Sequence, residues 1–164
     1  MTQPEAGETA PTPQAAPPCA LCSEAGGHLL WQNTALRVLR VDDTPLPGFT
    51  RAVWQAHRRE MTDLCAADQQ LLMRVVFTVE KVLRAELAPH KVNLAQLGNR
   101  VAHVHWHIIP RWPDDPYFPE SPWSAVQPGT AAQAARWEQQ RAQARARLPR
   151  YETALIEALD ALHS

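Results

Sequence analysis

Three of the seven histidines in this 164-residue chain fall within five residues, as His103-Val104-His105-Trp106-His107. Polar and apolar residues alternate here, and a period of two predicts a strand. On a strand, the three imidazoles would project from one face while Val104 and Trp106 pack on the other. We therefore expect a histidine face that is turned toward something polar.

Two kinds of chemistry suit three histidines on one strand face. In the first, neighbouring imidazoles chelate a metal ion, as in a metal-dependent hydrolase, which usually recruits a carboxylate or a further histidine as well. In the second, one imidazole attacks phosphorus directly while its neighbours bind the phosphate oxygens. A neutral imidazole suits that attack, because a pKa near 6.5 leaves it mostly unprotonated at pH 7. The histidines by themselves leave both kinds of chemistry open.

The elements that would position the histidine face are short strands and one long helix. Strands are predicted at residues 29–32, 36–41, 49–54, 91–97 and 101–109. Gly98-Asn99 is typical of a two-residue hairpin turn leading into the histidine strand. Apolar residues at spacings of three and four predict a helix over residues 66–87, closed by Pro89.

Composition divides the chain into three parts. Residues 1–18 hold five of the fifteen prolines and little apolar material, so they are predicted to form a disordered Pro/Ala-rich tail. Residues 19–120 are of the size and composition of a single domain. Residues 121–164 are predicted to form a helical extension of two helices separated by Pro149.

Charge and hydropathy exclude several classes of protein. The formal net charge of −1 favours neither bulk nucleic acid nor an acidic membrane surface. No apolar run approaches the roughly 18–20 residues that a membrane span needs. The first 27 residues contain no Lys or Arg and no apolar core of a secretory signal. We therefore expect a cytoplasmic protein whose three cysteines stay reduced.

The residues around the histidines resemble a known family. The run GNRVAHVHWHIIPR over residues 98–111 is similar to the motif of the histidine-triad (HIT) family, in the form found in bacterial proteins like the diadenosine polyphosphate hydrolases. The likeness extends over roughly residues 19–115. Further matches to the family pattern are Pro47-Gly48, His57, Lys91-Val92-Asn93 and the pair Cys19-x-x-Cys22.

This resemblance implies an α+β fold with an antiparallel sheet, a main helix packed on it, and a homodimeric assembly. It also implies an enzyme that cleaves nucleotides at the α-phosphate and requires no cofactor, with dinucleoside polyphosphates, nucleoside phosphoramidates or nucleotide sugars as substrates. His105 would be the nucleophile, His107 would contact the phosphate oxygens, and His103 would orient its neighbours. Asn93 and Asn99 would bind the phosphate or the leaving group. A nucleotide-binding regulatory protein with little turnover is the alternative from another class.

Two further points follow from the same comparison. Cys19 and Cys22 alone are half of a metal site, and two ordinary reduced thiols would also explain the pair. With His57 and His103 they would complete a structural zinc site, as the resemblance implies.

The sequence also departs from the family pattern before the triad. Its hairpin is expected to be short, and Asn99 and Arg100 stand where Gln and Ser or Thr are commoner. These differences leave the preferred leaving group open.

Overall fold

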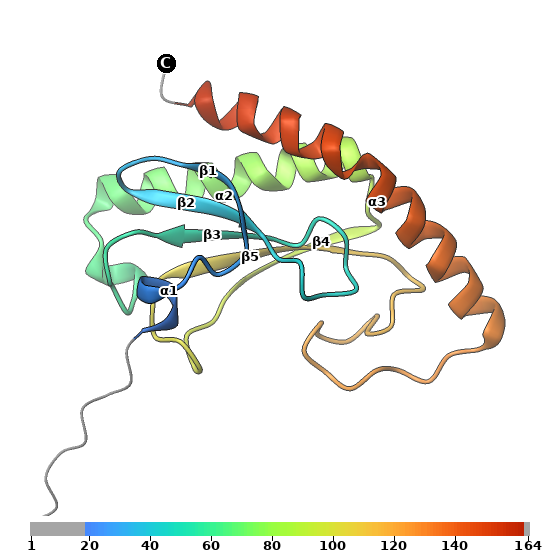
Figure 1. Cartoon of the computed structure of the whole chain (residues 1–164). Coiled ribbons are helices and arrows are strands. Elements are labelled where there is room, and N and C mark those ends of the chain that lie inside the picture. The colour runs from blue at the N-terminus through green and yellow to red at the C-terminus, as the bar shows by residue number, and fades with distance from the viewer. Residues whose placement is uncertain (1–18, 163–164) are drawn as a thin grey trace, which may run out of the picture.

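The structure is a computed structural model that describes residues 19–162, so the predicted tail over residues 1–18 lies outside the described residues. Figure 1 shows the arrangement of the elements. In chain order they are α1 (Ala20–Ser23), β1 (His28–Gln32), β2 (Leu36–Arg40), β3 (Thr50–Trp54), the short 3-10 helix η1 (Met61–Asp63), α2 (Ala66–Leu87), β4 (Lys91–Gln96), β5 (His105–Arg111) and α3 (Ala131–Asp160).

The five strands form one antiparallel sheet in the order β1-β2-β3-β5-β4. This confirms the predicted α+β fold with an antiparallel sheet. The histidine-bearing strand β5 lies inside the sheet, between β3 and β4, so its backbone is held on both sides. Four of the five strands begin and end within one residue of their predicted bounds, and β5 is the exception.

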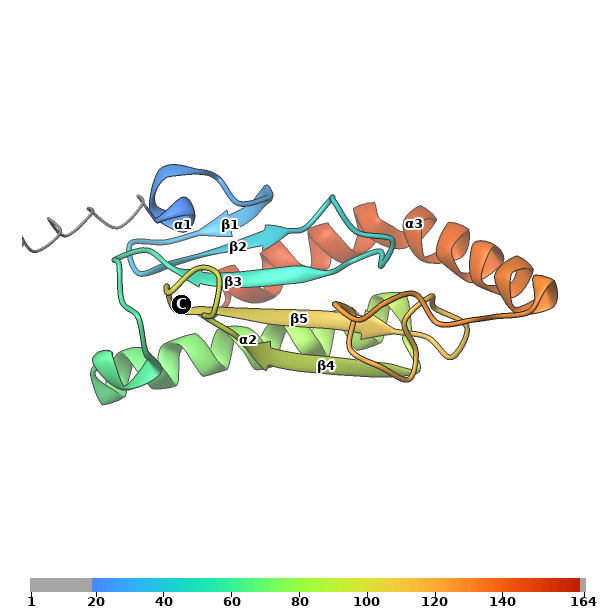
Figure 2. The ribbon, with the colours of Figure 1, turned by 90° about the horizontal axis from the view of Figure 1, so that it is seen from below.

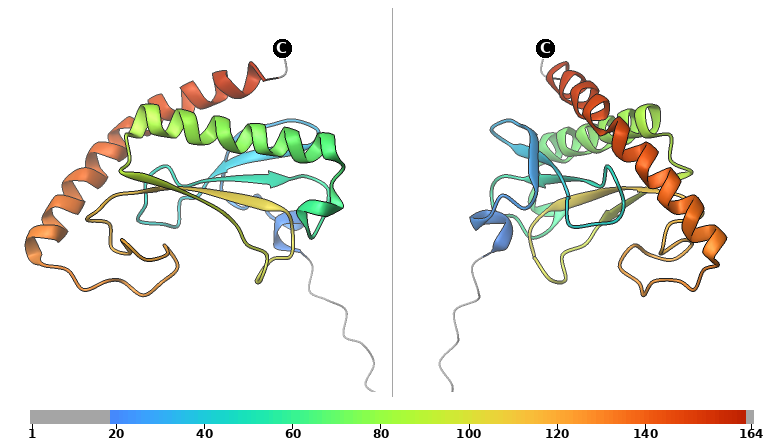
Figure 3. Two further views of the ribbon diagram at one scale, coloured as in Figure 1. Left: turned by 180° about the vertical axis from the view of Figure 1, so that it is seen from behind. Right: turned by 45° about the vertical axis from the view of Figure 1, so that its right-hand side comes forward.

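Helices α2 and α3 cover one face of the sheet (Figures 1 and 3). The face of α2 that meets the sheet carries the predicted apolar spacing, and six of its residues are buried there: Leu72, Val75, Val76, Val79, Leu83 and Leu87. They pack against even-numbered strand residues such as Val38, Ala52 and Ile108. The helix ends at Ala88, which adopts a left-handed conformation just before Pro89.

The prediction that Pro149 separates two C-terminal helices is wrong, because α3 continues through it. A proline inside a helix removes one hydrogen bond and crowds the preceding turn. Here α3 is anchored on both sides of Pro149: Trp137 packs into a small cluster beside the 112–130 segment, and Tyr151 and Leu155 pack into the main core. Neither α3 nor any other helix within residues 19–162 is long and apolar enough to cross a membrane.

The opposite face of the sheet carries the odd-numbered residues of the inner strands. This face is only partly covered, by α1 at one end and by the segment 112–130 at the other (Figure 2). Leu21 of α1 packs on Leu39 and Val53, and Trp112 packs on Ile109. Between these two coverings the sheet face stays open over the middle of β3 and β5.

Candidate active site

Two of the three histidines, His105 and His107, lie on β5 and project from the open face, as predicted. The strand begins only at His105, so the predicted strand over residues 101–109 is wrong at its start. The chain before it is a loop of eight residues, 97–104, so Gly98-Asn99 is not a two-residue hairpin and the connection is longer than expected. His103 lies at the end of this loop.

Contacts outside the ladder explain why the strand begins late. The backbone N–H of Val104 donates to the carbonyl of Arg58, and the carbonyl of Val104 accepts from the N–H of Trp54. The residues before β5 are therefore tied to the segment that follows β3. His103, fully buried, turns its ring away from the pocket that His105 and His107 line.

His105 is held in one orientation by its neighbour. Its side chain is buried, and Nδ1 lies 2.5 Å from the backbone carbonyl oxygen of His103. A carbonyl oxygen only accepts, so Nδ1 carries the proton and Nε2 keeps its lone pair. Burial lowers the pKa of His105, and the nearby Arg51 charge lowers it further. The ring is therefore neutral at pH 7, with a nucleophilic nitrogen available.

His107 is 6% exposed and stands beside His105, with ring centroids 4.8 Å apart. Burial, with the charges of His105 and Arg51, lowers the pKa of His107 to about 3. Its Nδ1 is buried and has no hydrogen-bond partner among the described residues. The residue also lines the cavity, so its neutral imidazole can offer an N–H group to a bound ligand.

The two histidines line an open cavity of about 560 Å³, a volume that suits a small-molecule ligand. Its walls come from β3, the loop before β5, β5 itself and the 112–130 segment. The residues that line it are Arg51, Leu97, Asn99, Arg100, Val101, His105, His107 and Trp123. In this described set there are two arginines and no carboxylate, so the cavity is suited to an anion.

The charged and aromatic lining residues Arg51 and Trp123 were not predicted from the sequence, and neither were the apolar Leu97 and Val101. Arg51 is the one charged residue of β3, but its place in the cavity follows from strand pairing that its sequence does not show. Trp123 lies in a proline-rich stretch whose path cannot be read from its residues. Its ring is 51% exposed and stands edge-on to His107, with centroids 5.1 Å apart.

The two asparagines expected at the site occupy different places. Asn99 is exposed on the loop before β5 and lines the cavity. Asn93 lies on β4 opposite Ile109, and its Oδ1 accepts a hydrogen bond of 2.9 Å from Nη1 of Arg111. It is not among the residues that line the cavity.

Arg111 joins the end of β5 to the segment that follows it. The side chain is 2% exposed, and Nε and Nη2 donate to the two carboxylate oxygens of Asp115 at 2.8 and 3.1 Å. Nη1 donates to Asn93 and to the carbonyl of Glu120. This bidentate pair fixes the start of the segment that carries Trp123.

Asp115→Ala is expected to destabilise the protein strongly, because it leaves the Arg111 charge buried and unpaired. Breaking a buried pair in this way costs about 3–5 kcal/mol of unfolding free energy. Denaturant titration measures the loss. Asp114→Ala is the matched control, since the neighbouring carboxylate pairs with Arg136 at the surface and should matter much less. Equal losses in the two variants would contradict the structural role of Asp115.

The four predicted metal ligands come together beside the active site. Ligand atoms of Cys19, Cys22, His57 and His103 all lie within 4.8 Å of one another. Nδ1 of His103 is 3.4 Å from each sulfur, and Nδ1 of His57 is 3.5 Å from that of Cys22. The other nitrogen of His103 lies 2.6 Å from the carbonyl oxygen of Trp54 and donates to it. The lone pair of Nδ1 is therefore directed at the group, which could hold zinc as a Cys₂His₂ site.

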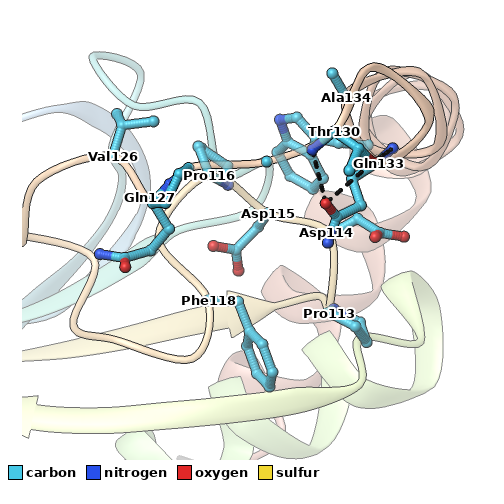
Figure 4. A pocket seen from close by; sticks show the side chains of 13 residues that line it. Pro113, Asp114, Asp115, Pro116, Phe118, Val126, Gln127, Thr130, Gln133 and Ala134 are labelled. Atoms are coloured by element: carbon cyan, nitrogen blue, oxygen red, sulfur yellow. Dashed lines mark hydrogen bonds between the residues drawn. The ribbon is translucent and has the colours of Figure 1, made fainter.

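A second, smaller cavity of about 210 Å³ lies between the 113–118 segment and the first turn of α3 (Figure 4). Its two carboxylates are already paired, Asp115 with Arg111 and Asp114 with Arg136. Thr130 and Gln133 bond one another as the capping box of α3. Among the described residues that line this second cavity, the carboxylates and the polar side chains of the capping box are therefore already bonded to other groups.

The chain is similar to a known family and to several solved structures. The HIT domain matches residues 23–114 of the chain. No curated protein matches the sequence. Among solved structures, a histidine triad protein from Marinobacter aquaeolei is 27% identical with a TM-score of 0.59, covering 82% of this chain and 92% of that one. One from Bradyrhizobium japonicum is 27% identical with a TM-score of 0.56, covering 73% and 88%. A zinc-bound histidine triad family protein from Mycobacterium smegmatis is 17% identical with a TM-score of 0.54, covering 84% and 97%.

Proposed function

The chain belongs to the HIT domain family, and we propose that it is a nucleotidyl hydrolase or transferase that forms a covalent intermediate on His105. The substrate is cleaved at the α-phosphate and is of the dinucleoside polyphosphate or nucleoside phosphoramidate type. The observation that carries the proposal is the bond from Nδ1 of His105 to the carbonyl of His103. It leaves Nε2 unprotonated in a cavity that is rich in cations and suited to phosphate.

The reaction has two steps. Nε2 of His105 attacks the α-phosphorus, an N–P bond forms, and the bond to the leaving group breaks with its electrons on that group. The positively charged imidazole is then a good leaving group. The oxygen of water or of another acceptor bonds to phosphorus, the N–P bond breaks with its electrons on Nε2, and the acceptor's proton passes to the solvent or to the first leaving group. The imidazole of His107, which lines the same cavity, donates to a phosphate oxygen that gains charge during the attack.

A metal-dependent hydrolase built on the triad has less support from the donor set. His103 belongs to the Cys/His group, which leaves His105 and His107 as the only imidazoles among the described residues that line the cavity. Catalytic zinc sites commonly use three protein ligands, and the same lining residues include no carboxylate to supply the third.

The direct test is a turnover screen of purified protein over dinucleoside polyphosphates, nucleoside phosphoramidates and nucleotide sugars. We expect release of a nucleoside monophosphate from at least one class. Equilibrium binding of nucleoside monophosphates is measured in parallel. Tight binding of nucleoside monophosphates without turnover of any substrate class would contradict the proposed enzyme and support a nucleotide-binding regulatory protein.

We also propose that the Cys/His group binds a structural zinc ion. Its four donors converge, and the Mycobacterium smegmatis relative is zinc-bound. Bound there, the ion would crosslink α1 to the segment after β3, through His57, and to the loop before β5, through His103, and would take no part in the phosphoryl transfer. The described cysteines are free thiols, which supports the proposal of a cytoplasmic, reducing location.

We propose further that the protein is a homodimer. Strand β4 ends the sheet, and β5 is its only strand neighbour in the described chain. An unpaired edge of this kind is a natural place for a second copy to add its own strand. Light scattering coupled to size-exclusion chromatography should give twice the chain mass at micromolar concentration. A mass equal to one chain under those conditions would contradict the proposal.

A further inference from the structure

One charged side chain lies in an otherwise apolar strand beside the histidines. Arg51 is the second residue of β3, where the other four residues are buried. In the ladder it stands directly opposite His107, on the same open face of the sheet. It also lines the histidine cavity. The fold thus places a guanidinium next to both imidazoles.

The contacts of Arg51 within the described chain include no counter-ion for its charge. Nη1 donates to the backbone carbonyl of Gly26 at 3.1 Å, and Nε is buried with no partner in the described part of the chain. No ion pair joins Arg51 to a carboxylate among residues 19–162. Burial lowers the pKa of Arg51, which reflects the cost of holding this charge away from water. A buried charge without a partner costs free energy, and a bound anion would offset that cost.

We propose that Arg51 is a substrate-binding residue, whose guanidinium binds the phosphate oxygens of the nucleotide held against His105 and His107. A planar guanidinium can donate two parallel hydrogen bonds to phosphate, which a lysine cannot. The identity of the ligand as a nucleotide rests on the proposed function. The need for an anion at Arg51 rests only on the burial and bonding of its side chain.

Arg37 provides the internal comparison. It lies on β2 on the same face of the sheet, and its Nε is also buried without a partner in the described chain. Its two terminal nitrogens, however, donate to Gln55 and to the carbonyl of Leu21, and it does not line the cavity. Arg37 therefore fastens α1 to the sheet, while Arg51 has donors left for a ligand.

The test compares a charged ligand with its uncharged counterpart. Titration calorimetry measures the affinities of AMP and adenosine, and of GMP and guanosine, for the wild type, Arg51→Gln, Arg51→Lys and Arg37→Gln. Arg51→Gln should weaken binding of the monophosphates about 10- to 100-fold and leave the nucleosides unchanged. Arg51→Lys should restore part of the loss. Arg37→Gln should lower the melting temperature without changing the ratio of monophosphate to nucleoside affinity.

The outcomes separate this inference from the proposed reaction. An unchanged affinity ratio in Arg51→Gln would overturn it, and so would an equal loss of both ligands, which indicates only a structural role. A wild type with no preference for the monophosphates would overturn it as well. An Arg51-dependent preference in a protein that turns over no substrate would support the inference and contradict the proposed reaction.

Discussion

His105→Ala is expected to abolish turnover, by a factor on the order of 10⁴ or more. No other described group can form the same bond to phosphorus: the ring of His103 is turned into the Cys/His group, and His107 lacks the backbone carbonyl that fixes the tautomer of His105. Nucleoside monophosphate binding should survive, because Arg51 and the cavity walls remain. Retained binding also shows that the variant is folded.

The intermediate itself can be detected. Wild-type protein is mixed with α-labelled substrate and quenched within the first turnovers, and the label should be attached to protein, stable in base and labile in acid, as expected of a phosphorus–imidazole bond. The same quench of His105→Ala should give no labelled protein. Label that persists in the variant, or full activity without His105, would contradict the assignment of His105 as the nucleophile. The alternative that the triad histidines bind a metal ion would then be favoured.

His107→Ala provides a graded comparison in the same experiment. Its loss removes a hydrogen-bond donor to the phosphate oxygens but leaves the nucleophile in place. Removing one donor of this kind typically lowers kcat by about 10²–10³-fold. We therefore expect slow but measurable turnover and a labelled intermediate that accumulates more slowly. A variant as inactive as His105→Ala would mean that the two roles are assigned to the wrong histidines.

Local pattern was enough to predict the elements that bury an apolar face. The bounds of α2 follow from its spacing of apolar residues and from Pro89, and both signals are local. The strands of the sheet were predicted in the same way. Their order, with β5 between β3 and β4, was not predicted, because strand pairing depends on contacts distant in sequence.

The errors lie where distant contacts override local pattern. The alternation of residues 103–107 is that of a strand, but His103 is drawn into the Cys/His group and bonded to Trp54 before the ladder begins. Pro149 is a helix breaker by local rules, yet packing on both sides carries α3 through it. Asp115 stands in a proline-rich stretch whose path cannot be read from its residues, and it is buried where it pairs with Arg111.

Arg51 illustrates the limit for the site itself. A lone arginine in a strand is most often exposed at the rim of a sheet. Its role follows from its position opposite His107 and from the lack of a paired carboxylate among residues 19–162, and neither can be read from the sequence. The triad was recognisable because its members are adjacent in sequence, whereas the cations around it are assembled by the fold.

Loss of zinc is the second large effect that we expect. Purified, untagged protein should carry about one zinc ion per chain, and Cys22→Ser should lower the free energy of unfolding by an amount on the order of several kcal/mol, since structural zinc sites contribute folding energy directly. Metal analysis and denaturant titration measure the two quantities. The matched control is Cys65→Ser, because that thiol is also free and exposed but lies outside the Cys/His group.

The same change should affect stability far more than chemistry. The carbonyl of His103 holds His105, but that bond uses the backbone, and β5 is fixed on both sides by its neighbours. Folded Cys22→Ser at low temperature should therefore retain most of the wild-type rate while its melting temperature falls. A chelator should lower the melting temperature of the wild type, and added zinc should restore it. Negligible zinc in the purified protein, together with a Cys22→Ser variant as stable as Cys65→Ser, would show that the four residues hold no ion and that His103 acts only to orient its neighbour.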